Sequence, residues 1–270
     1  DARRVAAVRW QTLLKASGKC VLLDKLLPKL KAEGHRVLIF SQMVKMLDLL
    51  SDYLRDRRYS HERLDGTIRG DLRQAAIDRF CKPGSDTFAF LLSTRAGGVG
   101  INLTAADTVI LFDPDWNPQN DVQAMARCHR IGQTKAVQVY KLCTKGTYEM
   151  HMLATANTKL GLEHAVMKTG AHSRQNRTST GFGKREAEDE EEAGMKKMTI
   201  EKLLKSGAQV LNAEQDAEAS AFSNSSIEDI LAHYSETRSL GGGGGGGDEA
   251  FTRAKEGGSF FSQASFVAES

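Results

Sequence analysis

Short apolar segments alternate with segments of helical periodicity through the first 160 residues, and this alternation limits the possible folds more than any other feature. Four short runs, apolar or alternating, have the character of buried strands: residues 37–40, 88–93, 108–112 and 136–142. Four other segments carry apolar residues at helical spacing: residues 43–57, 72–80, 118–130 and 148–160. A leading helix is expected at residues 19–33, with a kink or break at Pro28. The pattern predicts an α/β fold, a mostly parallel sheet with helices on both faces.

The composition changes after about residue 170, where this pattern ends. Polar residues 171–185 lead into an acidic run at 186–192, and seven consecutive glycines occupy positions 241–247. Acidic runs and glycine runs are typical of flexible linkers, because they cannot bury enough apolar surface to fold. We therefore expect the last hundred residues to be a largely flexible tail.

Two short helices are expected within this tail, at residues 199–206 and 226–235. The second has Ser225 or Ser226 as a plausible N-cap and two acidic residues in its first turn. The expected organisation has five parts: a lead-in at 1–18, an α/β lobe at 19–168, an acidic flexible linker at 169–198, short helical segments at 199–240, and a glycine-rich tail at 241–270.

Charge is divided unevenly along the chain. Residues 1–170 hold 26 Lys and Arg against 17 Asp and Glu, whereas residues 171–270 hold 11 against 17. A basic lobe attracts the phosphate backbone, so nucleic acid is the partner that the first part of the chain favours. Many soluble domains carry such a charge without binding DNA, and the charge alone does not identify a DNA-binding protein.

The four cysteines are scattered and contain no Cys-x-x-Cys pair, which argues against a zinc site and a disulfide framework. This usage fits a reducing nuclear or cytosolic compartment. No apolar run approaches the ~20 residues of a membrane span, and no membrane partner is expected. The chain begins with Asp1 rather than methionine, so we expect it to be a piece of a longer protein.

Gln123, Arg127 and Arg130 stand at i, i+4 and i+7, so a helix over 118–130 would place all three side chains on one face. Two arginines one turn apart suit an anion with several charges, because each guanidinium offers planar, permanently charged donors to phosphate oxygens. An ordinary solvated basic face is the alternative. Asp113, Asp115 and nearby residues imitate half of a calcium loop, but proline and alanine replace its required glycine and glutamate, and no metal site is expected.

Four segments also carry recognisable motifs: VLIFSQM at 37–43, LDGTIRGDLRQAAIDRF at 64–80, LSTRAGGVGINL at 92–103, and DWNPQNDVQAMARCHRIGQ at 115–133. In this order they resemble motif IV, the segment after it, motif V and motif VI of the Swi/Snf-type ATPases of helicase superfamily 2. The resemblance implies a RecA-like second lobe of a helicase-like motor.

The tail carries a second resemblance, in TIEKLLKSGAQ at 199–209, SSIEDILAHYSETRS at 225–239 and GGSFFSQASFVAES at 257–270. These segments are similar to those that follow the ATPase in chromodomain-helicase-DNA-binding (CHD) proteins, most closely the Kismet-like subgroup. The glycine run departs from that pattern. The alternatives are another Swi/Snf-type motor, such as an ISWI-like remodeller, or a catalytically inactive lobe kept as a DNA- or histone-binding module.

The resemblance assigns residues to ATP. Arg127 and Arg130 match the positions of arginine fingers for the γ-phosphate, and Gln123 would orient one of them or a nucleotide-bound water; a solvated glutamine is the alternative. Gly98, Gly100 and Asn102 are assigned to ATP binding. Glycines remove side chains where the backbone must approach a ligand or adopt positive φ.

The same resemblance assigns six residues to the DNA backbone: Ser41, Gln42, Arg69, Thr94, Arg95 and Gly97. For Ser41 and Gln42 the alternative is capping of a strand end, and for Arg69 it is a helix-surface charge. Asp65 and Gly66 are expected to form a turn.

No G-x-x-x-x-G-K-[ST] sequence occurs, and no predicted strand ends in an Asp-Glu pair for Mg²⁺. The resemblance implies that ATP and Mg²⁺ are bound mainly by a preceding N-terminal ATPase lobe of the same protein, and that the fragment alone is inactive. The expected partners are double-stranded DNA, nucleosomes with their histones, and that lobe, all in the nucleus. The acidic tail is also a candidate autoinhibitory strap.

Overall fold

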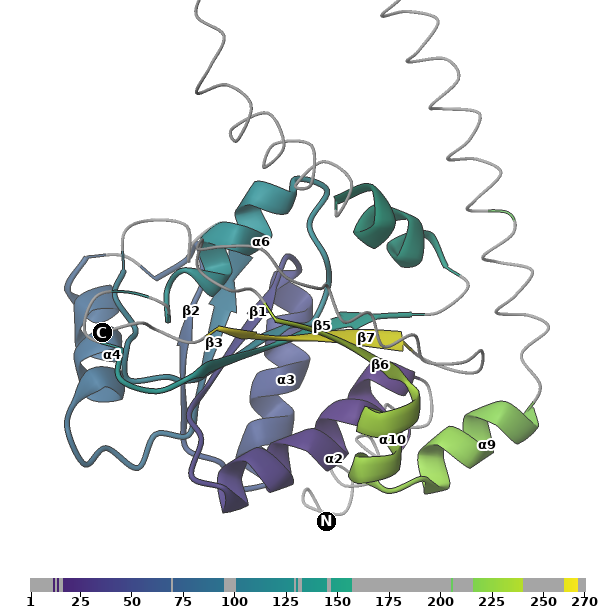
Figure 1. Cartoon of the computed structure of the whole chain (residues 1–270). Coiled ribbons are helices and arrows are strands. Elements are labelled where there is room, and N and C mark those ends of the chain that lie inside the picture. The colour runs from purple at the N-terminus through teal and green to yellow at the C-terminus, as the bar shows by residue number, and fades with distance from the viewer. Residues whose placement is uncertain are drawn as a thin grey trace, which may run out of the picture. The chain divides into compact units, whose positions relative to one another are not determined.

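The computed structural model describes residues 12, 14, 17–68, 70–94, 101–128, 130, 133–144, 147–156, 205, 216–239 and 260–266 (Figure 1). The chain divides into two compact units, one formed by residues 1–144 and 216–270 and the other by residues 145–215. In the second unit, residues 148–156 are helical, within the helix expected at 148–160. None of the helices described is long and apolar enough to cross a membrane.

The first unit is built on a parallel sheet, as predicted. Its strands in chain order are β1 Val37–Ser41, β2 His61–Leu64, β3 Ala89–Ser93, β4 Thr108–Leu111 and β5 Val137–Cys143. They lie in the order β2-β3-β1-β4-β5, and every neighbouring pair is parallel. Two strands from the tail extend the sheet: β7 (Phe260–Phe266) pairs antiparallel with β5, and β6 (Ser235–Ser239) pairs parallel with β7.

Successive side chains of each strand enter opposite hydrophobic cores, because side chains alternate across a sheet. In β1, Val37 and Ile39 join one core, whereas Leu38 and Phe40 join the other. Helices cover both faces: α2 (Gly18–Ala32), α3 (Val44–Asp56), α9 (Asp216–Asn224) and α10 (Ile227–His233) contribute to the first core, α4 (Asp71–Cys81) and α6 (Pro118–Met125) to the second. The prediction of an α/β fold with helices on both faces is confirmed.

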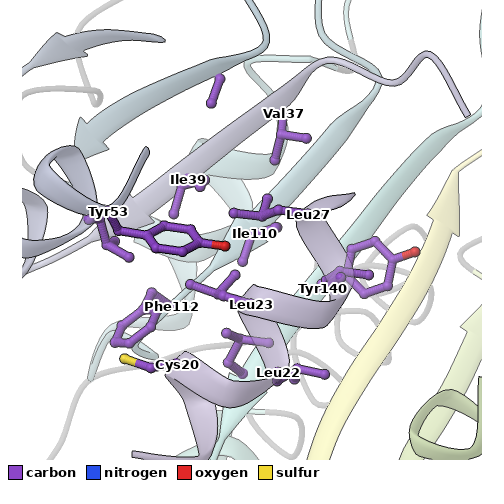
Figure 2. Packing of buried hydrophobic residues seen from close by; sticks show 14 of the residues in the cluster. Cys20, Leu22, Leu23, Leu27, Val37, Ile39, Tyr53, Ile110, Phe112 and Tyr140 are labelled. Carbon is purple, nitrogen blue, oxygen red and sulfur yellow. The ribbon is translucent and has the colours of Figure 1, made fainter. Parts of the chain in front are cut away.

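Helix α2 supplies much of the first core. Figure 2 shows Leu23 and Leu27 of α2 lying against Ile39 and Ile110 of the sheet. The helix continues through Pro28, which is exposed, so the predicted break is absent.

Strand β2 was not predicted, because its residues His61, Glu62 and Arg63 are polar and partly exposed. It forms one edge of the sheet, and its charges are paired: Arg79 with Glu62 at 2.6 Å, and Arg63 with Asp48 at 2.6 Å. Charged side chains are common on edge strands, where they oppose pairing with other chains. An edge strand of this kind lacks the apolar run that marks a buried one.

Helices α9 and α10 from the tail pack on α2. Phe222 of α9 and Ile230 of α10 are buried in the first core. The Lys25 ammonium of α2 donates to the carbonyls of Phe222 (3.4 Å), Ser223 (2.7 Å) and Ser225. These carbonyls lie at the end of α9 and just beyond it, where a cation satisfies acceptors that the helix leaves open.

The junction of the two helices is fixed by further polar contacts. Ser226 is the N-cap of α10 and accepts the Asp229 N–H at 3.1 Å. The sequence had left Ser225 and Ser226 as alternatives for this cap. Glu228 in the first turn of α10 pairs with Lys29 of α2 at 3.0 Å. This part of the tail is therefore integrated into the lobe, which the polar sequence around it did not indicate.

Replacing Ile230 with alanine should lower the free energy of unfolding by about 2–5 kcal/mol, because its side chain is fully buried and the substitution leaves a cavity. Urea denaturation of the 270-residue chain measures the effect. Asn224→Ala, at an exposed position of α9, serves as a control and should change stability by no more than about 0.5 kcal/mol. Equal stabilities for the two variants would contradict the packing of α10 in the core.

Candidate functional site

The carboxyl ends of β1 and β4 are joined by Asp113. Its carboxylate accepts hydrogen bonds from the Ser41 hydroxyl at 2.5 Å and from the Gln42 N–H at 2.8 Å. The Gln42 side chain donates to the Pro114 carbonyl at 2.5 Å. Both residues assigned to DNA thus also fasten the end of β1 to the loop after β4, which is the capping role given as their alternative.

The loop after β4 is organised by its own acidic residues. Asp115 accepts the Asn117 N–H at 2.9 Å, and Asn117 is the N-cap of α6, accepting the Gln119 N–H at 3.1 Å. Asp121, buried in α6, accepts the Asp115 N–H at 3.3 Å and lies 3.5 Å from the Lys141 ammonium of β5. These carboxylates are therefore engaged inside the lobe and hold the start of α6 in place.

These acids do not fit a metal site. Among the described residues, no group of three or more His, Cys, Asp or Glu side chains could hold a metal ion.

Burial raises the pKa of Asp121 to about 6, which the nearby Lys141 ammonium only partly counteracts.

The predicted geometry of Gln123, Arg127 and Arg130 is wrong, because α6 ends at Met125. Gln123 lies exposed on the helix, whereas Arg127 and Arg130 lie in the turn and bend that follow it, the Arg127–Arg130 turn. The three side chains therefore do not share one helical face.

The backbone hydrogen bonds change pattern where the helix ends. A helix through Arg130 would give the N–H groups of Arg127, Cys128 and Arg130 to carbonyls four residues earlier. Instead, the Arg127 N–H donates to the Ala124 carbonyl at 3.2 Å, the Cys128 N–H to the Met125 carbonyl at 3.3 Å, and the Arg130 N–H to the Cys128 carbonyl at 3.2 Å. Beyond the helix, the Arg127 carbonyl accepts the Leu103 N–H at 3.2 Å and the Cys128 carbonyl accepts from the Gln133 side chain at 3.3 Å, so residues outside the helix hold this segment.

The positive charge of Arg130 nevertheless acts on Arg127. Arg127 is 6% exposed, whereas Arg130 is exposed. Burial, and secondarily the positive charge of Arg130, lower the pKa of the Arg127 guanidinium. Two neighbouring cations, one of them largely desolvated, form a place where a multiply charged anion would relieve mutual repulsion.

The other predicted site residues fall into two groups. Thr94 is partly buried directly after β3, and Asn102 is exposed, its carbonyl 3.7 Å from the Cys81 sulfur. The remaining ones lie outside the described residues: Arg69, Arg95, Gly97, Gly98 and Gly100. The predicted turn at Asp65 is confirmed, since its carboxylate accepts the Thr67 N–H at 2.9 Å.

Sequence reasoning gave no role to two residues within the quoted motifs. Gln133 is 9% exposed, and its side chain bridges the motif VI segment and residues 104–106. Trp116, in the loop that Asp113 and Asp115 organise, is 60% exposed. A large aromatic residue within a polar loop, and a glutamine that closes an arginine-rich motif, are signals that could have drawn attention to both.

Comparison with known proteins places these residues in a family. The model of the helicase conserved C-terminal domain matches residues 18–132. Human chromodomain-helicase-DNA-binding protein 8 is 53% identical over 260 residues, which are 96% of this chain and 9% of that protein. Chromodomain-helicase-DNA-binding protein 6 of Rattus norvegicus and human chromodomain-helicase-DNA-binding protein 7 are each 52% identical over 96% of this chain. The chain belongs to the CHD family.

The CHD relationship extends through the tail, and it favours CHD over the alternative of an ISWI-like motor. The chain spans 8–9% of the length of these CHD relatives. A solved structure, "Crystal structure of the C-terminal part of Fun30 ATPase domain", is also similar, with a TM-score of 0.50 and 43% identity. That match covers 52% of this chain and 45% of the other. The predicted RecA-like helicase lobe is therefore confirmed.

Asp121→Asn should change the pH dependence of stability. Because the pKa of Asp121 is raised to about 6, its stabilising contribution is fully present below the unfolded pKa near 4 and is lost as pH rises through 6. Asparagine does not ionise, so the variant should gain on the order of 2–3 kcal/mol relative to wild type between pH 4 and pH 7. Urea unfolding at several pH values tests this, and a pH-independent difference would contradict it.

Proposed function

We propose that this chain is the second ATPase lobe of a longer DNA-dependent ATPase that remodels nucleosomes in the nucleus. CHD membership supports the general class, a chromatin remodelling ATPase. The observation that carries the proposal is the closeness of the Arg127 and Arg130 charges on a turn that is fastened to Leu103, at the end of motif V. The family assignment and this closeness together favour an ATP-hydrolysing lobe over a lobe that only binds.

In this proposal Arg127 and Arg130 approach the γ-phosphate of ATP bound by a preceding lobe. Guanidinium groups stabilise the charge that develops on the transferred phosphoryl oxygens, an effect worth roughly 10³–10⁵ in rate. Arg130 is exposed and can reach a ligand held by another lobe, while Arg127 is set in place by burial. Gln123, which is exposed on α6, would contact the same ligand only when that ligand is closed against the Arg127–Arg130 turn. We assign Gly98, Gly100 and Asn102 to the nucleotide by family resemblance alone.

Mg²⁺ would be held by the preceding lobe rather than here. The carboxylates around α6 are engaged with N–H groups and with Lys141, and they do not fit Mg²⁺ ligation. This chain would instead supply positive charge once the two lobes close.

DNA contact is proposed at the carboxyl edge of the sheet. Ser41, Gln42 and Thr94 end β1 and β3, which are neighbouring parallel strands, so these residues lie at the same edge. Ligands of open α/β sheets bind at this edge. The exposed Trp116 lies in the loop after β4, next to β1, and offers a flat apolar surface for sugar or base contact. Arg69, Arg95 and Gly97 complete the proposed DNA set by family resemblance.

Arg130→Ala, in the full-length protein that carries this lobe, should reduce nucleosome-stimulated ATP hydrolysis by roughly 10³–10⁵. Nucleosome affinity should stay close to wild type, because the arginine acts on the nucleotide. Arg127→Ala should show the same loss, and Arg55→Ala should show none, since Arg55 is a surface residue of α3 paired with Asp52. Near-normal hydrolysis by Arg130→Ala would rule out the finger role, and background hydrolysis by the wild type would indicate a binding module.

Binding to naked DNA should depend strongly on salt and little on sequence, because the proposed contacts are to the phosphate backbone. The logarithm of the association constant should fall linearly with the logarithm of salt concentration, by about 0.9 for each phosphate neutralised. Fluorescence anisotropy with two duplexes of unrelated sequence measures both properties. A preference for one duplex that persists at high salt would contradict backbone reading.

A further inference from the structure

We propose that Gln133 is a positioning residue that holds the Arg127–Arg130 turn against the segment following motif V. The proposal has a structural part, the anchoring of the turn, and a catalytic consequence that rests on the proposed function.

Gln133 uses its whole amide group inside the lobe. Its Nε2 donates to the carbonyls of Thr104 at 3.2 Å, Ala106 at 2.8 Å and Cys128 at 3.3 Å. Its Oε1 accepts the Lys135 N–H at 3.0 Å. The amide is therefore a bridge between residues 104 and 106 on one side and residues 128 and 135 on the other.

Backbone hydrogen bonds hold both ends of the Arg127–Arg130 turn. At one end the Leu103 N–H donates to the Arg127 carbonyl at 3.2 Å, and at the other the Gln133 N–H donates to the Arg130 carbonyl at 2.9 Å. The Cys128 carbonyl, between the two arginines, accepts from the Gln133 side chain. Movement of Gln133 would therefore loosen the backbone that carries both guanidinium groups.

The segment to which Gln133 attaches is itself fixed to the sheet. Asp107, buried just before β4, accepts the Arg36 N–H at 3.1 Å and the Lys135 ammonium at 3.1 Å. His35 lies 3.2 Å from the same carboxylate. The turn is thus anchored on the amino ends of β1 and β4, which are among the most buried strands of the lobe.

Glutamine is the side chain that fits this position. The amide provides two N–H donors and one acceptor in a single plane, at the end of a chain long enough to reach three carbonyls. A carboxylate of the same shape keeps the acceptor but replaces the donor group with an oxygen facing those carbonyls. Leaving buried carbonyls without donors is unfavourable, so a glutamate here should release the turn.

The test compares Gln133→Glu and Gln133→Met with Gln138→Glu in the full-length protein. Both Gln133 variants preserve length without branching, and both remove the donors. Gln138, partly buried on β5, accepts from the Tyr140 hydroxyl and serves as the matched control. Amide hydrogen exchange should speed up at Leu103 and Arg130 in the Gln133 variants, by roughly ten- to a hundredfold, and should remain unchanged in Gln138→Glu.

Nucleosome-stimulated hydrolysis provides the second readout. The Gln133 variants should lose roughly ten- to a hundredfold in kcat, while KM for ATP stays near wild type, because a misplaced arginine mainly weakens transition-state contacts. A general loss of folding would instead lower the amount of active enzyme and accelerate exchange throughout the strands.

Wild-type exchange and wild-type kcat in Gln133→Glu would overturn the proposal, as would global unfolding of both Gln133 variants. Loosened exchange with unchanged kcat would overturn the catalytic consequence and retain the anchoring. If the wild-type protein shows no nucleosome-stimulated hydrolysis, the proposed function fails, and local exchange alone then decides whether Gln133 anchors the turn.

Discussion

Burial of both faces of the central parallel strands β1, β3 and β4 is the constraint on which the rest of the structure depends. Alternate residues of β1 enter different cores, so side chains within these three strands are committed to packing. Polar groups that act on a ligand must therefore lie where strands end. The lobe meets this constraint by fastening its strand-end loops to each other, as Asp113 does between β1 and the loop after β4.

Several acidic residues of the basic lobe are engaged in such contacts inside it. Burial would raise the pKa of Asp107, but hydrogen bonds from Lys135, the Arg36 N–H and His35 outweigh it and hold the pKa below its usual value. Asp65 behaves in the same way, with Thr67 and Arg63 opposing the effect of burial on its pKa. Carboxylates enclosed in this manner do little to repel an approaching phosphate backbone, whereas exposed ones would.

The sequence predicted the parts of the fold that depend on local pattern. Strands β1, β3, β4 and β5 were found because their apolar runs report burial on both faces, and the motif spellings identified the family. Strand β2 was missed because an edge strand needs no such run. The end of α6 was missed because the segment after it is held by Leu103 and Gln133, contacts that helical spacing in the sequence does not reveal. The sequence thus singled out Arg127 and Arg130, but it did not predict that both lie beyond the end of α6.

The antiparallel pairing of β7 with β5 has a consequence for how such lobes can be handled. Without β7, the backbone of β5 from Val137 to Cys143 would present a row of unpaired N–H and C=O groups along a strand that is largely buried and apolar. Open edges of this kind template pairing between molecules. A lobe truncated before residue 260 should consequently tend to self-associate, because residues 260–266 would no longer cover the edge of β5.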